Sequence, residues 1–167
     1  MGMRALVPVE EYLATVYEPD CDYVDGELID RNVGEKSHSK VQRWFIAFFF
    51  NQRAALGTHV FPEQRIRMGP KKYRVPDVCV VVGEEPEEEV FTTPPFLCIE
   101  ILSPEDRASR VQHKLSDYLA FGVPNIWVVD PWNRRAFVYT KAGMREAQDV
   151  LETENPKISV ELRGIFD

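Results

Sequence analysis

Hydrophobic residues along the chain form short strand-like runs separated by segments with helical spacing. The runs 96–102 and 125–130 are almost wholly apolar, which is typical of strands buried on both faces of a sheet. Between them, residues 104–121 place apolar side chains along one helical stripe and end at Gly122, so they predict a helix. A strand, a helix and a second strand in this order predict two parallel neighbouring strands.

The N-terminal half contains a hairpin signal and a long helical segment. The Asp25-Gly26 pair separates two short β-like runs within 23–30, and Asp-Gly is a strong two-residue hairpin signal. Residues 37–56 carry apolar side chains on two helical faces, so other elements enclose this helix or it forms a subunit contact. The remaining expected elements are a short helix at 8–17, strands at 59–68 and 74–82, and a last strand at 136–141.

The start of the helix at 104–121 has its own signal. Pro104 suits the first helical position, and Ser103 with Asp106 has the spacing of an N-terminal cap. We also expect the strand at 75–82 to lie antiparallel beside the strand at 96–102.

These elements predict one α/β domain over residues 1–167. Its expected architecture is a sandwich with a mixed central sheet, flanking helices and an N-terminal hairpin. A chain of 167 residues buries roughly 70% of its unfolded surface, and no linker rich in Gly or Ser divides it. The net charge of −7 disfavours non-specific nucleic-acid binding by the whole surface but is compatible with a local basic strip.

Cysteine content and hydropathy bear on location. The odd number of cysteines and the absence of CxxC spacing fit a reducing compartment and do not indicate a zinc site. The N-terminus lacks the apolar segment of a signal peptide, and the longest apolar run, 44–50, is too short to cross a bilayer. We therefore expect a cytoplasmic protein without membrane association.

Two acidic residues stand in strand patterns where burial needs a reason. Glu100 lies inside the apolar run 96–102, and Asp77 follows Pro76 at the start of an apolar run. If the two strands pair, the acids converge, and their repulsion is relieved by a cation or by protonation. Oxygen ligands of this kind suit Mg²⁺ or Mn²⁺. The alternative is that each acid caps a turn or pairs with a nearby arginine.

Five sequence blocks resemble a known family over nearly the whole chain. In order, they are "YVDGELID", "RVPDVCVVV", "CIEILSPEDR", "KLSDYLAFGVPNIWVVDP" and "AFVYT". The chain resembles the Uma2 family of proposed restriction-endonuclease-like proteins, within the PD-(D/E)xK nuclease superfamily. The resemblance implies a restriction-endonuclease-like fold and a metal-dependent nuclease activity.

The same resemblance implies roles for individual residues. The metal ligands of the family correspond to Asp77 and Glu100, with the carbonyl of Ile101 as a further ligand. The acid of its "DGEL" block corresponds to Glu27, which by itself reads as a solvent-facing hairpin residue.

The lysine of the superfamily motif is missing from its usual place. It stands two residues after the Glu on the same strand face, where this chain has Leu102. The replacement is Lys114, on the flank of the following helix, from which a long side chain reaches the sheet. The alternative is a solvated helix lysine.

Positive charges concentrate around one turn, at Arg65, Arg67, Lys71, Lys72 and Arg74. This cluster is expected to position a phosphate backbone near the metal, although charges that protect a hairpin edge from aggregation explain it equally well. His38, at the start of the long helix, is expected to pack there rather than to act in catalysis.

The expected function is that of a Mg²⁺- or Mn²⁺-dependent endonuclease acting on DNA, with a homodimer supplying two sites for a duplex. Two alternatives stay open. One is an inactive nuclease-fold module that binds nucleic acid or a protein partner, and the other is a small-molecule hydrolase that uses the acids for general acid–base catalysis.

Overall fold

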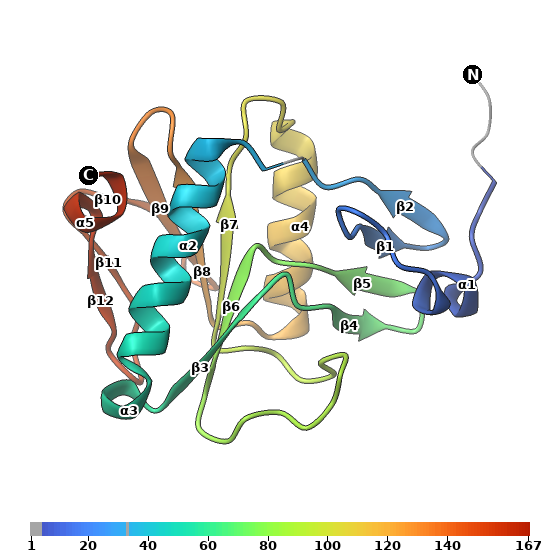
Figure 1. The fold of residues 1–167 in the computed structure, drawn as a ribbon, viewed down its shortest axis with the longest axis horizontal. Coiled ribbons are helices and arrows are strands. Elements are labelled where there is room, and N and C mark those ends of the chain that lie inside the picture. The colour runs from blue at the N-terminus through green and yellow to red at the C-terminus, as the bar shows by residue number, and fades with distance from the viewer. Residues whose placement is uncertain (1–4, 33) are drawn as a thin grey trace.

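The chain folds into a six-stranded mixed sheet with a helix on each face and a four-stranded antiparallel sheet beside it (Figure 1). The computed structural model describes residues 5–32 and 34–167. In order across the large sheet, the strands are β10 (Gly143–Ala147), β9 (Arg135–Thr140), β8 (Asn125–Asp130), β7 (Leu97–Ile101), β6 (Val78–Val82) and β3 (Thr58–Pro62). The small sheet has the order β2 (Glu27–Ile29), β1 (Asp22–Val24), β5 (Lys72–Arg74) and β4 (Ile66–Gly69).

The helices and a C-terminal hairpin complete the described structure. The helices are α1 (Val9–Ala14), α2 (Lys36–Asn51), α3 (Arg53–Leu56), α4 (Ala108–Phe121) and α5 (Leu162–Phe166). The hairpin consists of β11 (Val150–Glu152) and β12 (Ser159–Glu161). None of the helices in the described ranges has the length and hydropathy needed to cross a membrane.

The pairing around β7 agrees with the sequence pattern. β7 is parallel to β8, to which α4 connects it, and antiparallel to β6. β9 pairs antiparallel with β8. The predicted β–α–β unit and the predicted pairing of the two acid-bearing strands are therefore confirmed.

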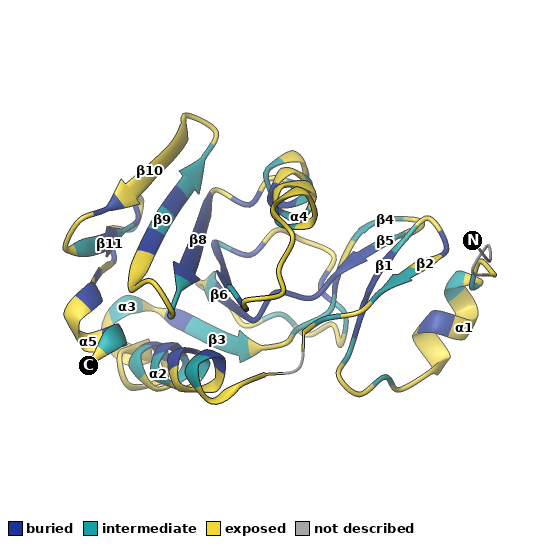
Figure 2. Cartoon of the chain, turned by 90° about the horizontal axis from the view of Figure 1, so that it is seen from above, coloured by how far each residue is buried: buried dark blue, intermediate teal, exposed yellow. Residues whose placement is uncertain are grey.

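The helices cover opposite faces of the large sheet, with buried strands between them (Figure 2). On β7, Leu97, Ile99 and Ile101 belong to the hydrophobic cluster that includes α2, whereas Cys98 belongs to the cluster that includes α4. Because side chains alternate along a strand, Glu100 lies on the α4 side.

The two segments predicted as single strands at 59–68 and 74–82 are each divided between the two sheets, so that part of the prediction is wrong. The first is β3 followed by β4, and the break falls at Glu63, whose φ of 49° is incompatible with a strand. The second is β5 followed by β6, with Pro76 at the break, where no N–H is available for a ladder. The chain thus crosses from the large sheet to the small one and returns directly before Asp77.

The predicted hairpin forms, but it is part of a larger unit. Asp25 and Gly26 have φ angles of 50° and 91°, the left-handed values that the turn requires. β1 then pairs with β5, which extends the hairpin into the four-stranded sheet.

Two helix boundaries differ from the prediction. The segment 37–56 contains a long helix and a short one, α2 and α3, and Phe50 is 55% exposed rather than enclosed. α4 begins at Ala108, not at Pro104, because Ser103 and Asp106 close a separate turn in which the Ser103 N–H donates to Asp106 Oδ2 over 2.7 Å.

Candidate active site

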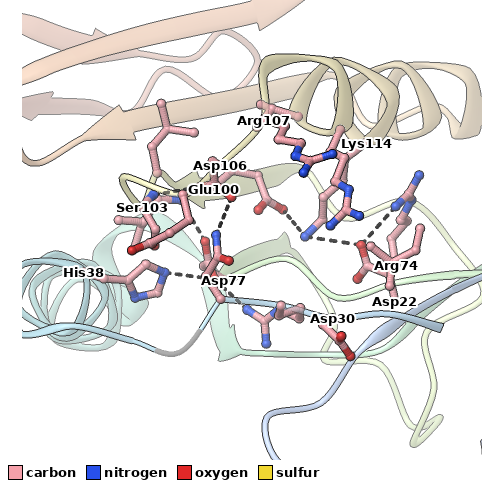
Figure 3. Close-up of a pocket in the computed structure, with 18 residues that line it drawn as sticks. Asp22, Asp30, His38, Arg74, Asp77, Glu100, Ser103, Asp106, Arg107 and Lys114 are labelled. Carbon is pink, nitrogen blue, oxygen red and sulfur yellow. Dashed lines mark hydrogen bonds and ion pairs between the residues drawn. The ribbon is translucent and has the colours of Figure 1, made fainter.

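A cavity of about 100 Å³ lies where β6 and β7 face the start of α4 and the small sheet (Figure 3). Its lining includes three acidic and three positively charged residues that are far apart in the sequence. They are Asp22, Asp77, Glu100, Arg31, Arg74 and Lys114. The walls come from both sheets and from α4, so the cavity exists only because the chain crosses between the sheets.

Asp77 and Glu100 occupy neighbouring places at the end of two paired strands. The β6–β7 register aligns Val78 with Ile99, and one further step sets Asp77 opposite Glu100. Residues in this relationship share one face of a sheet, with Cβ atoms about 5 Å apart. Both residues are buried, at 6% and 8% exposure, and both line the cavity.

Hydrogen bonds hold the Asp77 carboxylate on both of its oxygens. Oδ1 contacts Arg31 over 2.5 Å and His38 Nε2 over 3.3 Å, and Oδ2 accepts the backbone N–H of Ile101 over 2.7 Å. Burial opposes ionisation, but His38, Arg31 and Lys114 outweigh it and lower the pKa of Asp77 to about 2. Asp77 is therefore ionised at neutral pH.

The Glu100 carboxylate has the opposite character. Its Oε1 accepts the Tyr118 hydroxyl over 2.5 Å and lies 3.1 Å from Lys114 Nζ. Burial raises the pKa of Glu100 to about 7, with Lys114 acting against the rise and Asp77 adding to it. Unlike Asp77, Glu100 is therefore only partly ionised at neutral pH.

Lys114 reaches the cavity from α4 with a largely buried side chain. Its Nζ donates to the Val75 carbonyl over 2.9 Å and lies 3.1 Å from Glu100 and 3.6 Å from Asp22. Burial acts to lower the pKa of Lys114, but the charges of Asp22 and Glu100 outweigh it, so the pKa is raised and the ammonium keeps its proton. A solvated surface lysine does not fit this environment.

Three charged residues that line the cavity, Asp22, Arg31 and Arg74, were not predicted to lie beside Asp77 and Glu100. Asp22 accepts the Val75 N–H over 2.8 Å and pairs with Arg74 over 3.1 Å. Arg31 lies between Glu63 and Asp77, 3.2 Å from the Glu63 carboxylate. The hint for Asp22 in the sequence is that it directly precedes the β-like run that leads to Asp25-Gly26, and β1 places it on the same strand face as Val24.

The sequence matches one family model along most of its length. The model of the Uma2 family, described as "Putative restriction endonuclease", matches residues 9–165. This chain belongs to the Uma2 family. No curated protein matches the sequence at a significant level.

A solved structure agrees with the Uma2 assignment. It is the crystal structure of "a putative nuclease belonging to DUF820" from Anabaena variabilis ATCC 29413, with a TM-score of 0.81. The match covers 96% of this Uma2 chain and 97% of the other chain at 21% identity. At that identity the likeness establishes the fold, which is restriction-endonuclease-like, as predicted.

The basic cluster predicted from the Uma2 sequence is mostly neutralised in the fold. Arg74 is 5% exposed and pairs with Asp22 and Asp117, Lys72 Nζ lies 2.8 Å from Asp117, and Arg65 pairs with Asp20 over 2.8 Å. The other two members of the cluster, Arg67 and Lys71, are exposed.

Two further predicted residues lie in different settings. Ile101 is buried, lines the cavity and donates its N–H to Asp77. Glu27 is exposed on β2, opposite Val24, and does not line the cavity. We therefore leave Glu27 out of the proposed site.

His38 packs at the start of α2, as expected, but it also touches the site. It is buried, and its Nε2 lies 3.3 Å from Asp77. Burial acts to lower the pKa of His38, but the hydrogen bond to Asp77 outweighs it and the pKa is raised. Within the described ranges, His38 Nδ1 has no hydrogen-bond partner.

The donor chemistry of the cavity fits a hard divalent cation with incomplete protein coordination. Asp77 and Glu100 bring two carboxylates together from paired strands, and carboxylate oxygens are the ligands that Mg²⁺ and Mn²⁺ prefer. In this structure Arg31 and Lys114 supply the positive charge beside them. Among the described residues, no three His, Cys, Asp or Glu side chains are grouped to hold a metal by themselves. Water or substrate oxygens would therefore complete the shell, as is usual for Mg²⁺.

Proposed function

We propose that the protein is a divalent-metal-dependent endonuclease that hydrolyses phosphodiester bonds in DNA. The observation that carries the proposal is the convergence of Asp77, Glu100 and Lys114 on one cavity, from two paired strands and a helix. The family description supports the same reaction class. The missing strand lysine at Leu102 is compensated, because Lys114 places an ammonium beside the strand acid.

The carboxylates of Asp77 and Glu100 would hold Mg²⁺ or Mn²⁺, and the carbonyl of Ile101 remains a candidate ligand. Such a cation polarises a phosphoryl oxygen and lowers the pKa of a bound water. Arg31, His38 and the Ile101 N–H keep the Asp77 carboxylate ionised and fixed in orientation. The Tyr118 hydroxyl donates to Glu100 Oε1 and fixes the orientation of that carboxyl group.

Lys114 would act as a charged donor rather than as a base. Its raised pKa keeps the ammonium protonated at neutral pH, so it stabilises negative charge that develops on the phosphate or orients the attacking water. The carbonyl of Val75 and the carboxylate of Asp22 fix the ammonium in position before substrate binds.

Substrate phosphates would meet Arg107 and Arg110 at the cavity. Both residues line it and are exposed, and neither side chain has an ion pair within the described part of the chain. They replace the neutralised cluster around β4 and β5 as the cations best placed to hold a DNA backbone. A homodimer would supply the second site that cleavage of both strands requires.

The test is metal-dependent cleavage of supercoiled plasmid by the wild type and by Asp77→Ala, Glu100→Gln and Lys114→Ala. We expect each substitution to lower the rate by about a hundredfold or more. Asp77→Ala and Glu100→Gln each remove a proposed metal ligand, and Lys114→Ala removes the ammonium that stabilises charge developing at the phosphate. Glu27→Gln and Lys71→Ala are matched controls, since they remove exposed charges outside the cavity. Both controls should cleave at the wild-type rate.

Calorimetric titration with Mn²⁺ separates the proposal from its main rival. A nuclease requires binding that is lost in Asp77→Ala and Glu100→Gln. An inactive module that binds nucleic acid or protein predicts no binding dependent on these residues, and wild-type cleavage without added metal would favour general acid–base hydrolysis instead.

A further inference from the structure

A second cavity adjoins the candidate active site on the α4 side of the large sheet. Its volume is about 650 Å³, within the range of small-molecule sites. It shares four lining residues with the first cavity, namely Leu102, Ser103, Asp106 and Val111. Any ligand that extends from one cavity to the other therefore passes over the turn between β7 and α4.

The lining of the second cavity is apolar with aromatic walls. Val128 and Phe137 belong to β8 and β9, and Trp132 and Tyr139 add two further rings. Its polar lining consists of the amides of Gln112 and Asn133 together with Ser103, Asp106 and Asp130. This combination of flat apolar faces and a few amide groups suits a planar heterocycle that carries hydrogen-bonding edges.

Trp132 is 55% exposed, and hydrogen bonds hold its backbone in place. Its backbone N–H donates to Asp130 Oδ1 over 3.0 Å. Asp130 also accepts the Asn133 N–H over 3.1 Å and the Asn133 side-chain amide over 2.7 Å. The turn between β8 and β9 therefore presents a large indole from a fixed backbone, which limits the entropy lost when a ligand stacks on it.

We propose that this second cavity binds an unpaired nucleobase of the strand whose phosphate lies in the first cavity. The inference rests on the proposed nuclease function and extends it to the form of the substrate. A nucleotide joins a charged phosphate to a flat base through one sugar. The first cavity is lined by charged residues and would take the phosphate, and the adjoining second cavity is lined by aromatic rings and would take the base.

The base must be unpaired, because a paired base in a duplex exposes only its edges in the grooves. Stacking on Trp132 requires a free ring face, which single strands and locally opened duplexes provide. The preferred substrate is therefore single-stranded DNA or DNA with unpaired positions, including locally opened segments of a negatively supercoiled plasmid, rather than relaxed duplex.

The test is oligonucleotide binding in the presence of EDTA, so that cleavage is not needed. The probes are a short single-stranded oligothymidylate and an abasic oligomer with the same number of phosphates. Trp132 is well placed to report, since Trp127 is fully buried and Trp44 is partly buried. We expect oligothymidylate to quench tryptophan emission and to bind about fivefold or more tightly than the abasic oligomer.

Substitutions make the test specific to this cavity. Trp132→Ala should lose the quenching and weaken oligothymidylate binding about fivefold or more, while its affinity for the abasic oligomer stays unchanged. Trp132→Phe should restore most of the affinity. Phe50→Ala is the matched control, because Phe50 is also 55% exposed and lies on α2, outside this cavity.

Equal affinity for the two oligomers, or an unchanged affinity in Trp132→Ala, would overturn the base-binding site. Neither result touches the nuclease proposal, which depends on Asp77, Glu100 and Lys114. Conversely, base-dependent binding without any metal-dependent cleavage would support this cavity and contradict the nuclease.

Discussion

Lys114 Nζ and Glu100 Oε1 lie 3.1 Å apart, and the two residues come from a helix and from the strand that precedes it. The pair is buried, and burial nevertheless raises the pKa of Glu100 to about 7. One ammonium therefore does not fully compensate a carboxylate that also faces Asp77.

The first prediction concerns stability and pH without metal. The pKa of Glu100 rises from 4.5 to about 7 on folding, so the folded state binds more protons than the unfolded state between these values. Stability from this group is present below pH 4.5 and is lost as pH rises through 7, by on the order of 3 kcal/mol. Urea unfolding in EDTA should show the decline in the wild type.

Glu100→Gln is the variant that tests this assignment, because it cannot ionise. Its free energy of unfolding should fall less across the same pH range, while the contribution of His38 remains in both proteins. The ionisation of Asp77 does not interfere, since the pKa of Asp77 is lowered to about 2. Parallel pH profiles for the two proteins would contradict the raised pKa of Glu100.

The second prediction concerns Asp22, which holds the cavity together from the small sheet. Asp22→Ala removes the acceptor of the Val75 N–H and leaves Arg74 with one carboxylate fewer in a buried setting. We expect a loss of about 3–5 kcal/mol in the free energy of unfolding, measured with urea. Asp25→Asn is the control in the same hairpin, because Asn adopts the φ of 50° readily. A loss within about 0.5 kcal/mol of the control would contradict the structural role of Asp22.

The third prediction separates two sets of basic residues as DNA-binding groups. Replacing Arg107 or Arg110 by Ala should weaken oligonucleotide binding in EDTA and reduce the slope of log affinity against log salt by about 1 for each phosphate that is no longer neutralised. Arg67→Ala and Lys71→Ala are the matched exposed controls and should leave the slope nearly unchanged. Fluorescence anisotropy measures the affinity. If the Arg67 and Lys71 variants reduced the slope and the Arg107 and Arg110 variants did not, the β4–β5 turn would be the DNA-binding surface instead.

Local patterns in the sequence were sufficient for the centre of the fold. The apolar runs of β7 and β8 and the helical stripe between them determine a parallel pair, and an acid within such a run requires a partner. The convergence of Asp77 and Glu100 depended in addition on the expected antiparallel pairing of the strand after Pro76 with β7. The choice of Lys114 needed the family resemblance as well, because helical spacing alone is compatible with a solvated lysine.

Long-range pairing could not be predicted in the same way. Arg74 looked like one member of an exposed basic cluster, yet its guanidinium is buried between Asp22 and Asp117, which are 52 and 43 positions away. Charge spacing along a chain does not reveal which charges meet their counterparts after folding. The same reason hid Arg31, whose position in the site depends on how the chain leaves β2.

The division of the predicted strands between two sheets was also missed, although local signals were present. Pro76 is the third residue of the run at 74–82, where it removes a backbone donor, and it lies between the end of β5 and the start of β6. Val75 before Pro76 and the apolar run that begins at Val78 suggested one continuous strand. The periodicity of apolar residues shows which face of a strand is buried, but it does not show to which sheet the strand belongs.

Because the chain crosses between the two sheets, the candidate site includes residues from the N-terminal hairpin and from the segment that follows it. A fragment that began at α2 would keep Asp77, Glu100 and Lys114 on their own elements but would lack Asp22 and Arg31. Arg74 would then keep only Asp117, and Asp77 would be without one of its cations. Trimming this protein to its large sheet would therefore remove part of the candidate site and leave the buried charges of the rest without partners.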